Sequence, residues 1–138
     1  MASDQLLALE RCEKIDEIII VTRSEPVRSG GKSSAVRLPS TRRRRWSTGG
    51  NSRAESVRLG AAGYFKQAEL AAIHDGARPF VSPALLDRVL SAAAETGAAA
   101  PAVLVKDTVK RAEQGVVLET VDRSTLYAVQ TPQVFQAD

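Results

Sequence analysis

Residues 73–81 hold the side chains whose types and spacing could do chemistry. Asp75 and Arg78 follow a short apolar run, 70–73, with two small residues between them. Asp75 can bind a hard cation such as Mg²⁺ through oxygen, and Arg78 can form a bidentate contact with phosphate. Gly76 lets the backbone approach a ligand closely. The spacing therefore indicates a site for a metal-bound phosphorylated substrate, with an exposed salt bridge at a strand end as the structural alternative.

Two further features lie near this segment in the predicted fold. Gly49 and Gly50 precede a helix that should begin at the capping pattern from Ser52 to Glu55. Free N–H groups at a helix start can bind an anion or a nucleotide. An ordinary glycine turn with a helix cap is the alternative, and it is favoured on this motif alone. His74, the only histidine, ends the strand and is expected to be packed and hydrogen-bonded.

An arginine cluster, Arg42 to Arg45, is followed by Trp46 and offers a different function. Consecutive cationic side chains can contact a nucleic-acid backbone, and an indole can stack on a base. The net charge of +3 comes largely from this stretch, since the half of the chain from residue 71 onward is nearly balanced. A non-catalytic nucleotide- or nucleic-acid-binding module therefore stays open as the alternative to an enzyme.

The elements that must position these residues alternate between strand and helix. We expect helices near 6–15, from 52 to about 62 and from 82 to 97, and strands at 17–22, 70–73, 98–105 and 127–130. A β-hairpin is expected from 107–109 and 116–121 around a polar turn at 110–115. Residues 24–48, rich in Ser, Arg, Gly and Pro, are expected to form a loop or a disordered segment. The alternation is typical of an α/β fold with a parallel sheet.

Composition limits the class of protein. The 138 residues, 43% hydrophobic and 25% charged, suit a single globular domain. No apolar run approaches the ~20 residues that a membrane-spanning helix needs. Cys12 is the only cysteine, so no internal disulfide is possible and a reducing cytoplasm is the expected location.

Five motifs in register resemble one family, the 2-C-methyl-D-erythritol 4-phosphate cytidylyltransferases of the non-mevalonate isoprenoid pathway. The motifs are Gly49-Gly50-x-x-Arg53-x-x-Ser56-Val57, His74-Asp75-Gly76-Ala77-Arg78-Pro79, Asp107-Thr108-Val109-Lys110, Thr120-Val121-Asp122-Arg123 and Gln130-Thr131-Pro132-Gln133-x-Phe135. The resemblance covers residues 49–138 closely and 6–23 more loosely. It implies a Rossmann-like nucleotidyltransferase fold, with a mostly parallel sheet, helices on both faces and a β-hairpin arm at 107–123.

The resemblance also implies a reaction and its partners. CMP would be transferred from CTP to 2-C-methyl-D-erythritol 4-phosphate with release of pyrophosphate, and Mg²⁺ would be the cofactor. The protein would be a homodimer in which the arm of each subunit reaches the active site of the other.

Each matched residue then takes an implied role. Asp75 would bind the metal, and the cytidine pocket would be lined by Gly50, Asn51, Arg53, Ser56 and Gly76. Arg78 and Thr131 would contact the methylerythritol phosphate, while Thr108 and Arg123 would reach it from the partner chain. Arg78 and Arg123 are the expected catalytic residues, because the reaction brings two anions together and needs positioning and charge neutralisation.

Two segments of the family pattern are not found in this sequence. One is an opening strand with a Gly-rich loop that binds the triphosphate, and the other is a C-terminal segment with a substrate-positioning lysine. The chain is therefore expected to be truncated at both ends, and its cytidylyltransferase activity is expected to be low or absent.

Overall fold

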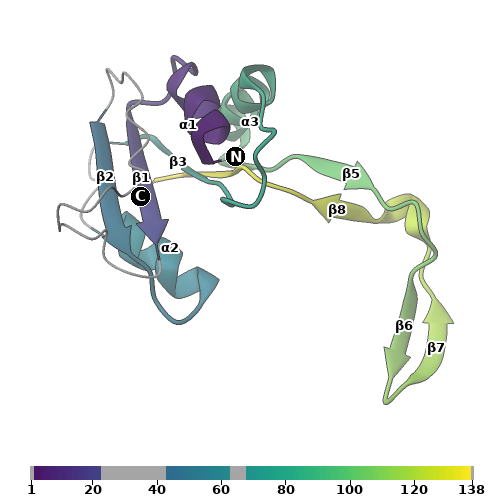
Figure 1. Cartoon of the computed structure of the whole chain (residues 1–138). Coiled ribbons are helices and arrows are strands. Elements are labelled where there is room, and N and C mark those ends of the chain that lie inside the picture. The colour runs from purple at the N-terminus through teal and green to yellow at the C-terminus, as the bar shows by residue number, and fades with distance from the viewer. Residues whose placement is uncertain (1, 23–42, 63–67, 138) are drawn as a thin grey trace.

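The computed structural model of the chain describes residues 2–22, 43–62 and 68–137. Strand β1 (Glu17–Thr22) pairs in parallel with β2 (Arg43–Thr48), and helix α2 (Arg53–Ala61) follows β2. The predicted strand at 17–22 is confirmed, and its β-branched run explains why these residues form a strand. Figure 1 shows β1 and β2 side by side, with α2 next to them.

The predicted loop at 24–48 is wrong for residues 43–48, which form β2, whereas residues 24–42 lie outside the described residues. Strand pairing uses backbone groups, so a run of polar residues without an apolar period can still form a strand. Arg45 and Trp46 are exposed, and the Arg45 Nε atom lies 2.7 Å from Glu17 Oε1 on β1. This ion pair engages one of the arginines that the nucleic-acid hypothesis needs.

A second sheet holds β3 (Leu70–Ile73), β9 (Gln133–Gln136) and β4 (Ala98–Ala99), in that order. β9 runs antiparallel to both neighbours, so β3 and β4 point the same way and helix α3 (Pro83–Thr96) connects them. The predicted ends of α3 are confirmed. Ser82 Oγ accepts a hydrogen bond from Leu85 N at 3.2 Å, and Gly97 closes the helix at φ 84°.

The hydrophobic core lies along one face of α3. It consists of buried residues from α3 and its neighbours, namely Cys12, Val81, Leu86, Val89, Leu90, Ala93 and Val134. Helix α1 (Ala2–Glu10) packs Ala8 and Leu9 against this cluster, which places α1 next to α3 in Figure 1. The core therefore fixes β3, β9 and α3, and with them the loop that follows β3.

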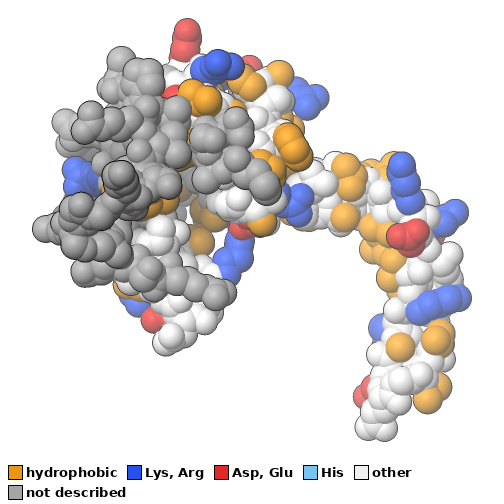
Figure 2. All heavy atoms as spheres, in the orientation of Figure 1, with side chains coloured by type: hydrophobic (Ala, Val, Ile, Leu, Met, Phe, Trp, Pro, Cys, Tyr) orange, Lys and Arg blue, Asp and Glu red, His pale blue; other side chains and the backbone are white. Residues whose placement is uncertain are grey.

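The remaining strands form an arm that projects from this body (Figure 1). β5 (Ala102–Leu104) pairs with β8 (Tyr127–Val129), and β6 (Lys110–Glu113) pairs with β7 (Val116–Thr120). A short 3-10 helix, η1 (Arg123–Thr125), lies between β7 and β8. The expected hairpin is present, and Figure 2 shows hydrophobic and charged side chains along its surface.

Two expected boundaries in this region are wrong. The expected strand at 98–105 divides into β4 and β5 around Pro101, which has no N–H to donate to a sheet. The expected turn at 110–115 is only two residues long, because Gln114 and Gly115 both have positive φ, 49° and 83°, and close the hairpin directly. No helix in the described ranges is long and apolar enough to cross a membrane.

Candidate functional site

The loop after β3 is held by hydrogen bonds to its own carbonyl groups. Arg78 N donates to Asp75 O at 3.0 Å and closes a turn. The side-chain amide of Gln5, a buried residue of α1, donates to Asp75 O at 2.9 Å and to Arg78 O at 3.0 Å. A buried group from a distant helix therefore fixes the backbone between the two charged residues of the site.

His74 and Thr131 complete this network from the strand side. His74 Nε2 lies 3.1 Å from Arg78 O, and Nδ1 lies 3.1 Å from Thr131 Oγ1. A carbonyl oxygen only accepts, so Nε2 carries the proton and the Thr131 hydroxyl donates to Nδ1. The same hydroxyl accepts from Asp75 N at 3.2 Å. The expectation that His74 is a packed, hydrogen-bonded residue is confirmed.

The environment of His74 favours its neutral form. Burial lowers the pKa of His74 below its ordinary value of 6.5, and the hydrogen bond to the Arg78 carbonyl and the charge of Asp75 oppose this shift. The charge of Arg78 adds to the lowering of the pKa. A neutral imidazole can both donate to Arg78 O and accept from Thr131, so this protonation state matches the observed contacts.

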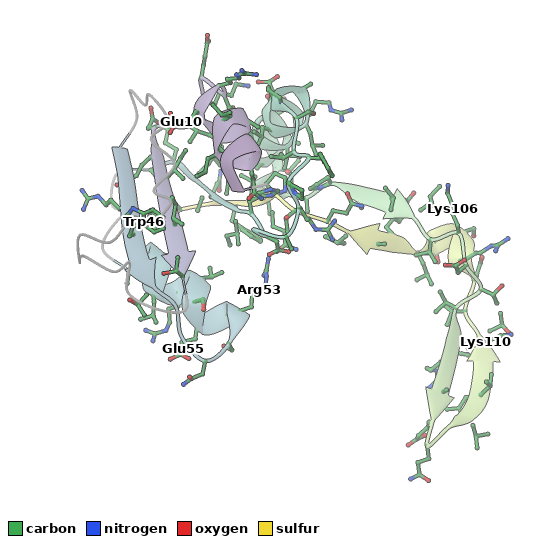
Figure 3. The ribbon with its side chains drawn as sticks, viewed as in Figure 1. Glu10, Trp46, Arg53, Glu55, Lys106 and Lys110 are labelled. Carbon is green, nitrogen blue, oxygen red and sulfur yellow. The ribbon has the colours of Figure 1, made fainter. Side chains whose placement is uncertain are left out.

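An ion pair joins the start of α2 to the loop after β3. Arg53 Nε and Nη2 each lie 3.1 Å from Asp75 Oδ1, and Arg53 Nη2 also donates to Gln133 Oε1 at 3.4 Å. Within the described residues, the ion pair of Asp75 is therefore with Arg53 and not with Arg78. Figure 3 shows Arg53 extending from α2 toward the loop. This ion pair joins two candidate segments that the sequence presents separately.

The start of α2 is organised by its own side chains. Ser52 Oγ accepts from Glu55 N at 3.1 Å, as the capping pattern predicts. Asn51 N donates to Glu55 Oε2 at 2.7 Å, and Gly50 N donates to Ser56 Oγ at 3.0 Å. These two N–H groups are therefore engaged by the protein itself.

Side chains of α2 closely approach the two glycines before it. A Cβ atom on Gly50 would lie 2.3 Å from Glu55 Cγ, and one on Gly49 would lie 2.8 Å from Ser56 Oγ. Gly76 differs, because a Cβ atom there would meet nothing within 4 Å. The space beside Gly76 that a Cβ would occupy is thus open.

The structure does not bring the arm residues to this site. Arg123, in η1, donates from Nη1 to Lys106 O at 2.6 Å, and Thr108 is exposed before β6. Figure 3 shows Lys106 on the arm, well separated from Arg53. Of the predicted site residues, Asp75, Gly76 and Arg78 lie on the loop after β3, and Thr131 contacts this loop. Gly50, Asn51, Arg53 and Ser56 lie at the start of α2, from which Arg53 reaches Asp75. Thr108 and Arg123 lie on the arm.

Comparison with known proteins shows which family this chain belongs to. The sequence model of the 2-C-methyl-D-erythritol 4-phosphate cytidylyltransferase family matches residues 2–138. The chain belongs to this family. A cytidylyltransferase of that name from Bacillus mycoides is 43% identical over 130 residues, which are 94% of this chain and 57% of the relative.

Solved structures of the family have the same fold. The 4-diphosphocytidyl-2C-methyl-D-erythritol synthase of Anaerococcus prevotii matches with a TM-score of 0.81 at 29% identity, over 98% of this chain and 59% of that chain. The cytidylyltransferase of Thermus thermophilus matches with a TM-score of 0.70 at 30% identity, over 99% of this chain and 60% of that chain. The chain thus has the Rossmann-like nucleotidyltransferase fold and spans a little over half the length of these relatives.

The loop after β3 offers one carboxylate, that of Asp75, for a metal. Among the described residues, no group of three or more His, Cys, Asp or Glu side chains could hold an ion. Mg²⁺ commonly takes one or two carboxylates and completes its shell with phosphate oxygens and water. Asp75 fits this use, because its side chain is 40% exposed and both contacts from Arg53 are to Oδ1.

Two residues of this site were not among the expected site residues. Gln5 fixes the loop, but nothing in its sequence neighbourhood marks it, because its partners are 70 and 73 residues away. Gln133 accepts from Arg53 and stands in the motif quoted from 130 to 135, so its motif offered a signal although no role was assigned.

Proposed function

We propose that this chain forms the metal and nucleotide end of a cytidylyltransferase site that transfers CMP from CTP to 2-C-methyl-D-erythritol 4-phosphate. The observation that carries the proposal is the Arg53–Asp75 ion pair, since it joins the nucleotide motif at the start of α2 to the carboxylate after β3. In the reaction, a phosphate oxygen of the acceptor attacks the α-phosphorus of CTP. One P–O bond forms, the bond to the β-phosphate breaks, and pyrophosphate leaves.

Positioning and charge are the main contributions expected of the protein. Bound Mg²⁺ would neutralise phosphate oxygens at Asp75. Gly50, Asn51, Arg53, Ser56 and Gly76 would hold the cytidine. Arg78 and Thr131 would bind the phosphate of the acceptor, with Arg78 neutralising the charge that builds up between the two anions. Thr131 would also orient Asp75, because the Thr131 hydroxyl accepts a hydrogen bond from the backbone N–H of Asp75.

The remaining cationic contact is proposed to come from a second copy. Thr108 and Arg123 lie on the arm, away from Asp75, so they would act on the site of a partner subunit in a homodimer. Apolar side chains on the arm support this arrangement, because they are about half exposed in the single chain, namely Val103, Leu104, Val116, Val117, Leu118, Tyr127 and Val129. A two-stranded ribbon is marginally stable alone, and a partner surface would bury these side chains. The proposal includes a cytoplasmic location, where Cys12 would remain reduced.

Calorimetry with CTP tests the nucleotide site. We expect the chain to bind CTP more tightly with Mg²⁺ than without it, and Asp75→Asn to remove most of this difference. Glu113→Gln, a change of an exposed carboxylate on the arm, is the matched control and should keep the magnesium effect. Equal magnesium dependence in Asp75→Asn and the control would contradict the assignment of Asp75.

Analytical ultracentrifugation tests the arm. We expect a dimer that Leu104→Lys dissociates, because a charge would have to be buried against the partner. Glu113→Lys places the same charge at the exposed tip of the hairpin and should leave the dimer intact. A monomer at all concentrations would contradict the proposed partner role of Thr108 and Arg123.

A further inference from the structure

The turn from Asp75 to Arg78 has every backbone N–H and C=O of its two end residues hydrogen-bonded. Asp75 O accepts from Arg78 N at 3.0 Å and from the Gln5 side-chain amide at 2.9 Å. Arg78 O accepts from the same amide at 3.0 Å and from His74 Nε2 at 3.1 Å. Asp75 N donates to Thr131 Oγ1 at 3.2 Å. Because a carbonyl oxygen has two lone pairs, both end carbonyls are saturated, and ligand binding is left to the two side chains.

Gln5 differs from the other partners because its side chain bonds to both ends of the turn. His74 reaches the backbone of Arg78, and Thr131 reaches the backbone of Asp75. The Gln5 amide nitrogen carries two hydrogens, and each of them meets a carbonyl oxygen that can only accept. Gln5 is 7% exposed, so these bonds are shielded from water. The relative position of the two end residues therefore depends on one buried side chain.

Helix α1 holds Gln5 in this position. Gln5 and Leu9 are four residues apart, so they lie on the same face of the helix. Ala8 and Leu9 pack against the core cluster of α3. Val81, which follows the turn in the sequence, belongs to that cluster. The same core thus supports both the donor and the chain on which its acceptors lie.

Loss of the Gln5 amide should loosen the turn without unfolding the chain. Each carbonyl would keep one of its two donors, Arg78 N for Asp75 O and His74 Nε2 for Arg78 O. The main effect should therefore be on where the side chains of Asp75 and Arg78 lie. A reaction that brings two anions together depends on this position, because catalytic groups must be held in a fixed geometry.

We propose that Gln5 is a positioning residue of the transferase site. From α1 it fixes the Asp75 carboxylate relative to the Arg78 guanidinium, and in this way it raises the affinity for magnesium-bound nucleotide. It touches neither metal nor nucleotide itself. Outer hydrogen-bond partners of a metal ligand change metal affinity by about 10–100-fold in other proteins. The choice of ligand rests on the proposed function, whereas the effect of Gln5 on the turn does not.

Amide exchange of the ligand-free chain tests the effect on the turn. Gln5→Met keeps the length of the side chain and removes both donors. Opening of the turn then breaks fewer hydrogen bonds, so the Arg78 amide should exchange about fivefold faster. Val89→Ala, a change in the buried core of α3, is the control for lost stability. It should leave the exchange of the Arg78 amide unchanged, because local opening of the turn does not involve Val89.

Calorimetry with CTP tests the positioning role. With Mg²⁺, CTP should bind about tenfold more weakly to Gln5→Met than to the wild type, whereas binding without Mg²⁺ should be the same. Val89→Ala should bind as the wild type does under both conditions. Gln5→Asn keeps both donors on a side chain that is one methylene shorter, so it should give an intermediate loss. It carries the same test if Gln5→Met does not fold.

Three outcomes separate this proposal from the proposed function. Unchanged exchange of the Arg78 amide in Gln5→Met would overturn the role of Gln5 in the turn. Faster exchange with unchanged magnesium-dependent binding would also overturn the proposal, because Gln5 would then act on structure alone. A wild type whose CTP binding does not depend on Mg²⁺ would contradict the proposed function and the ligand assigned here. In that case, faster Arg78 exchange in Gln5→Met would still support Gln5 as the residue that holds the turn.

Discussion

The loop after β3 and the arm differ in whether their side chains find partners within the same chain. Around the loop, buried Gln5 and Thr131 and half-buried His74 bond to one another or to the backbone of the same chain. On the arm, apolar side chains such as Leu104 and Tyr127 remain more than half exposed. The hydrogen bonds of the loop are therefore made within one chain, whereas the apolar side chains of the arm are not buried by the described residues of that chain. A residue of the loop should therefore affect the stability of the single chain, and a residue of the arm should affect association.

The largest difference in the free energy of unfolding is expected between a substitution in the core behind the loop and one on the arm. Leu86 is fully buried, so Leu86→Ala should lower the free energy of unfolding by about 2–5 kcal/mol through lost burial and a cavity. Leu118→Ala on the arm should change it by less than about 0.5 kcal/mol at high dilution. Urea titration measures both values, and similar values for the two variants would break the distinction.

Loss of the hydrogen bonds of Thr131 is expected to have the next largest effect on stability. Thr131→Val keeps the shape of the side chain but leaves His74 Nδ1 and Asp75 N without their partner, which should cost about 1–3 kcal/mol. Thr125→Val on the arm is the control, since its hydroxyl donates to Asp122 O in an exposed position. Thermal unfolding of the two variants compares them directly. A cost for Thr125→Val as large as that for Thr131→Val would contradict the difference between the regions.

His74 makes the stability of the loop region depend on pH. Because burial lowers the pKa of His74 below 6.5, the unfolded chain binds this proton at a higher pH than the folded chain does. The stabilisation is fully present above pH 6.5 and is lost as the pH falls through the folded pKa. Between about pH 7 and pH 5.5, the free energy of unfolding should fall more in the wild type than in His74→Gln. Parallel curves would show that His74 is not the group responsible.

The smallest effect is expected for the ion pair that crosses the arm. Arg111 Nε lies 2.7 Å from Glu119 Oε1, but both side chains are more than half exposed. Water and salt screen such pairs, so Glu119→Gln should change the free energy of unfolding by less than about 0.5 kcal/mol. A larger loss, unaffected by salt, would mean that the arm is more rigid in the single chain than its exposure indicates.

Local signals in the sequence explain why several elements could be predicted. The β-branched run in β1, the cap at Ser82 and the positive-φ glycine at position 97 act within a few residues, so their structures follow from local chemistry. β2 was missed because its pairing with β1 uses backbone groups, while its arginine side chains show no apolar period. A strand whose pairing partner is distant in the sequence need not show a local sequence pattern that predicts it.

The site shows the same limit. Asp75 and Arg78 were found from their types and spacing, and a salt bridge at the strand end was the structural alternative to a metal and phosphate site. Arg53, 22 residues before Asp75, becomes its partner only once α2 and β3 are placed together. The role of Gln5 depends on how α1 packs beside α3, which no local pattern determines.

Paramagnetic broadening by Mn²⁺ in place of Mg²⁺ tests most directly whether the carboxylate paired with Arg53 holds a nucleotide-bound metal. With CTP present, the account predicts that Mn²⁺ broadens the amide signals of Asp75 and Gly76 first, and that Asp75→Asn removes this broadening. Broadening that is centred on the arm or on Trp46, or that persists unchanged in Asp75→Asn, would contradict it.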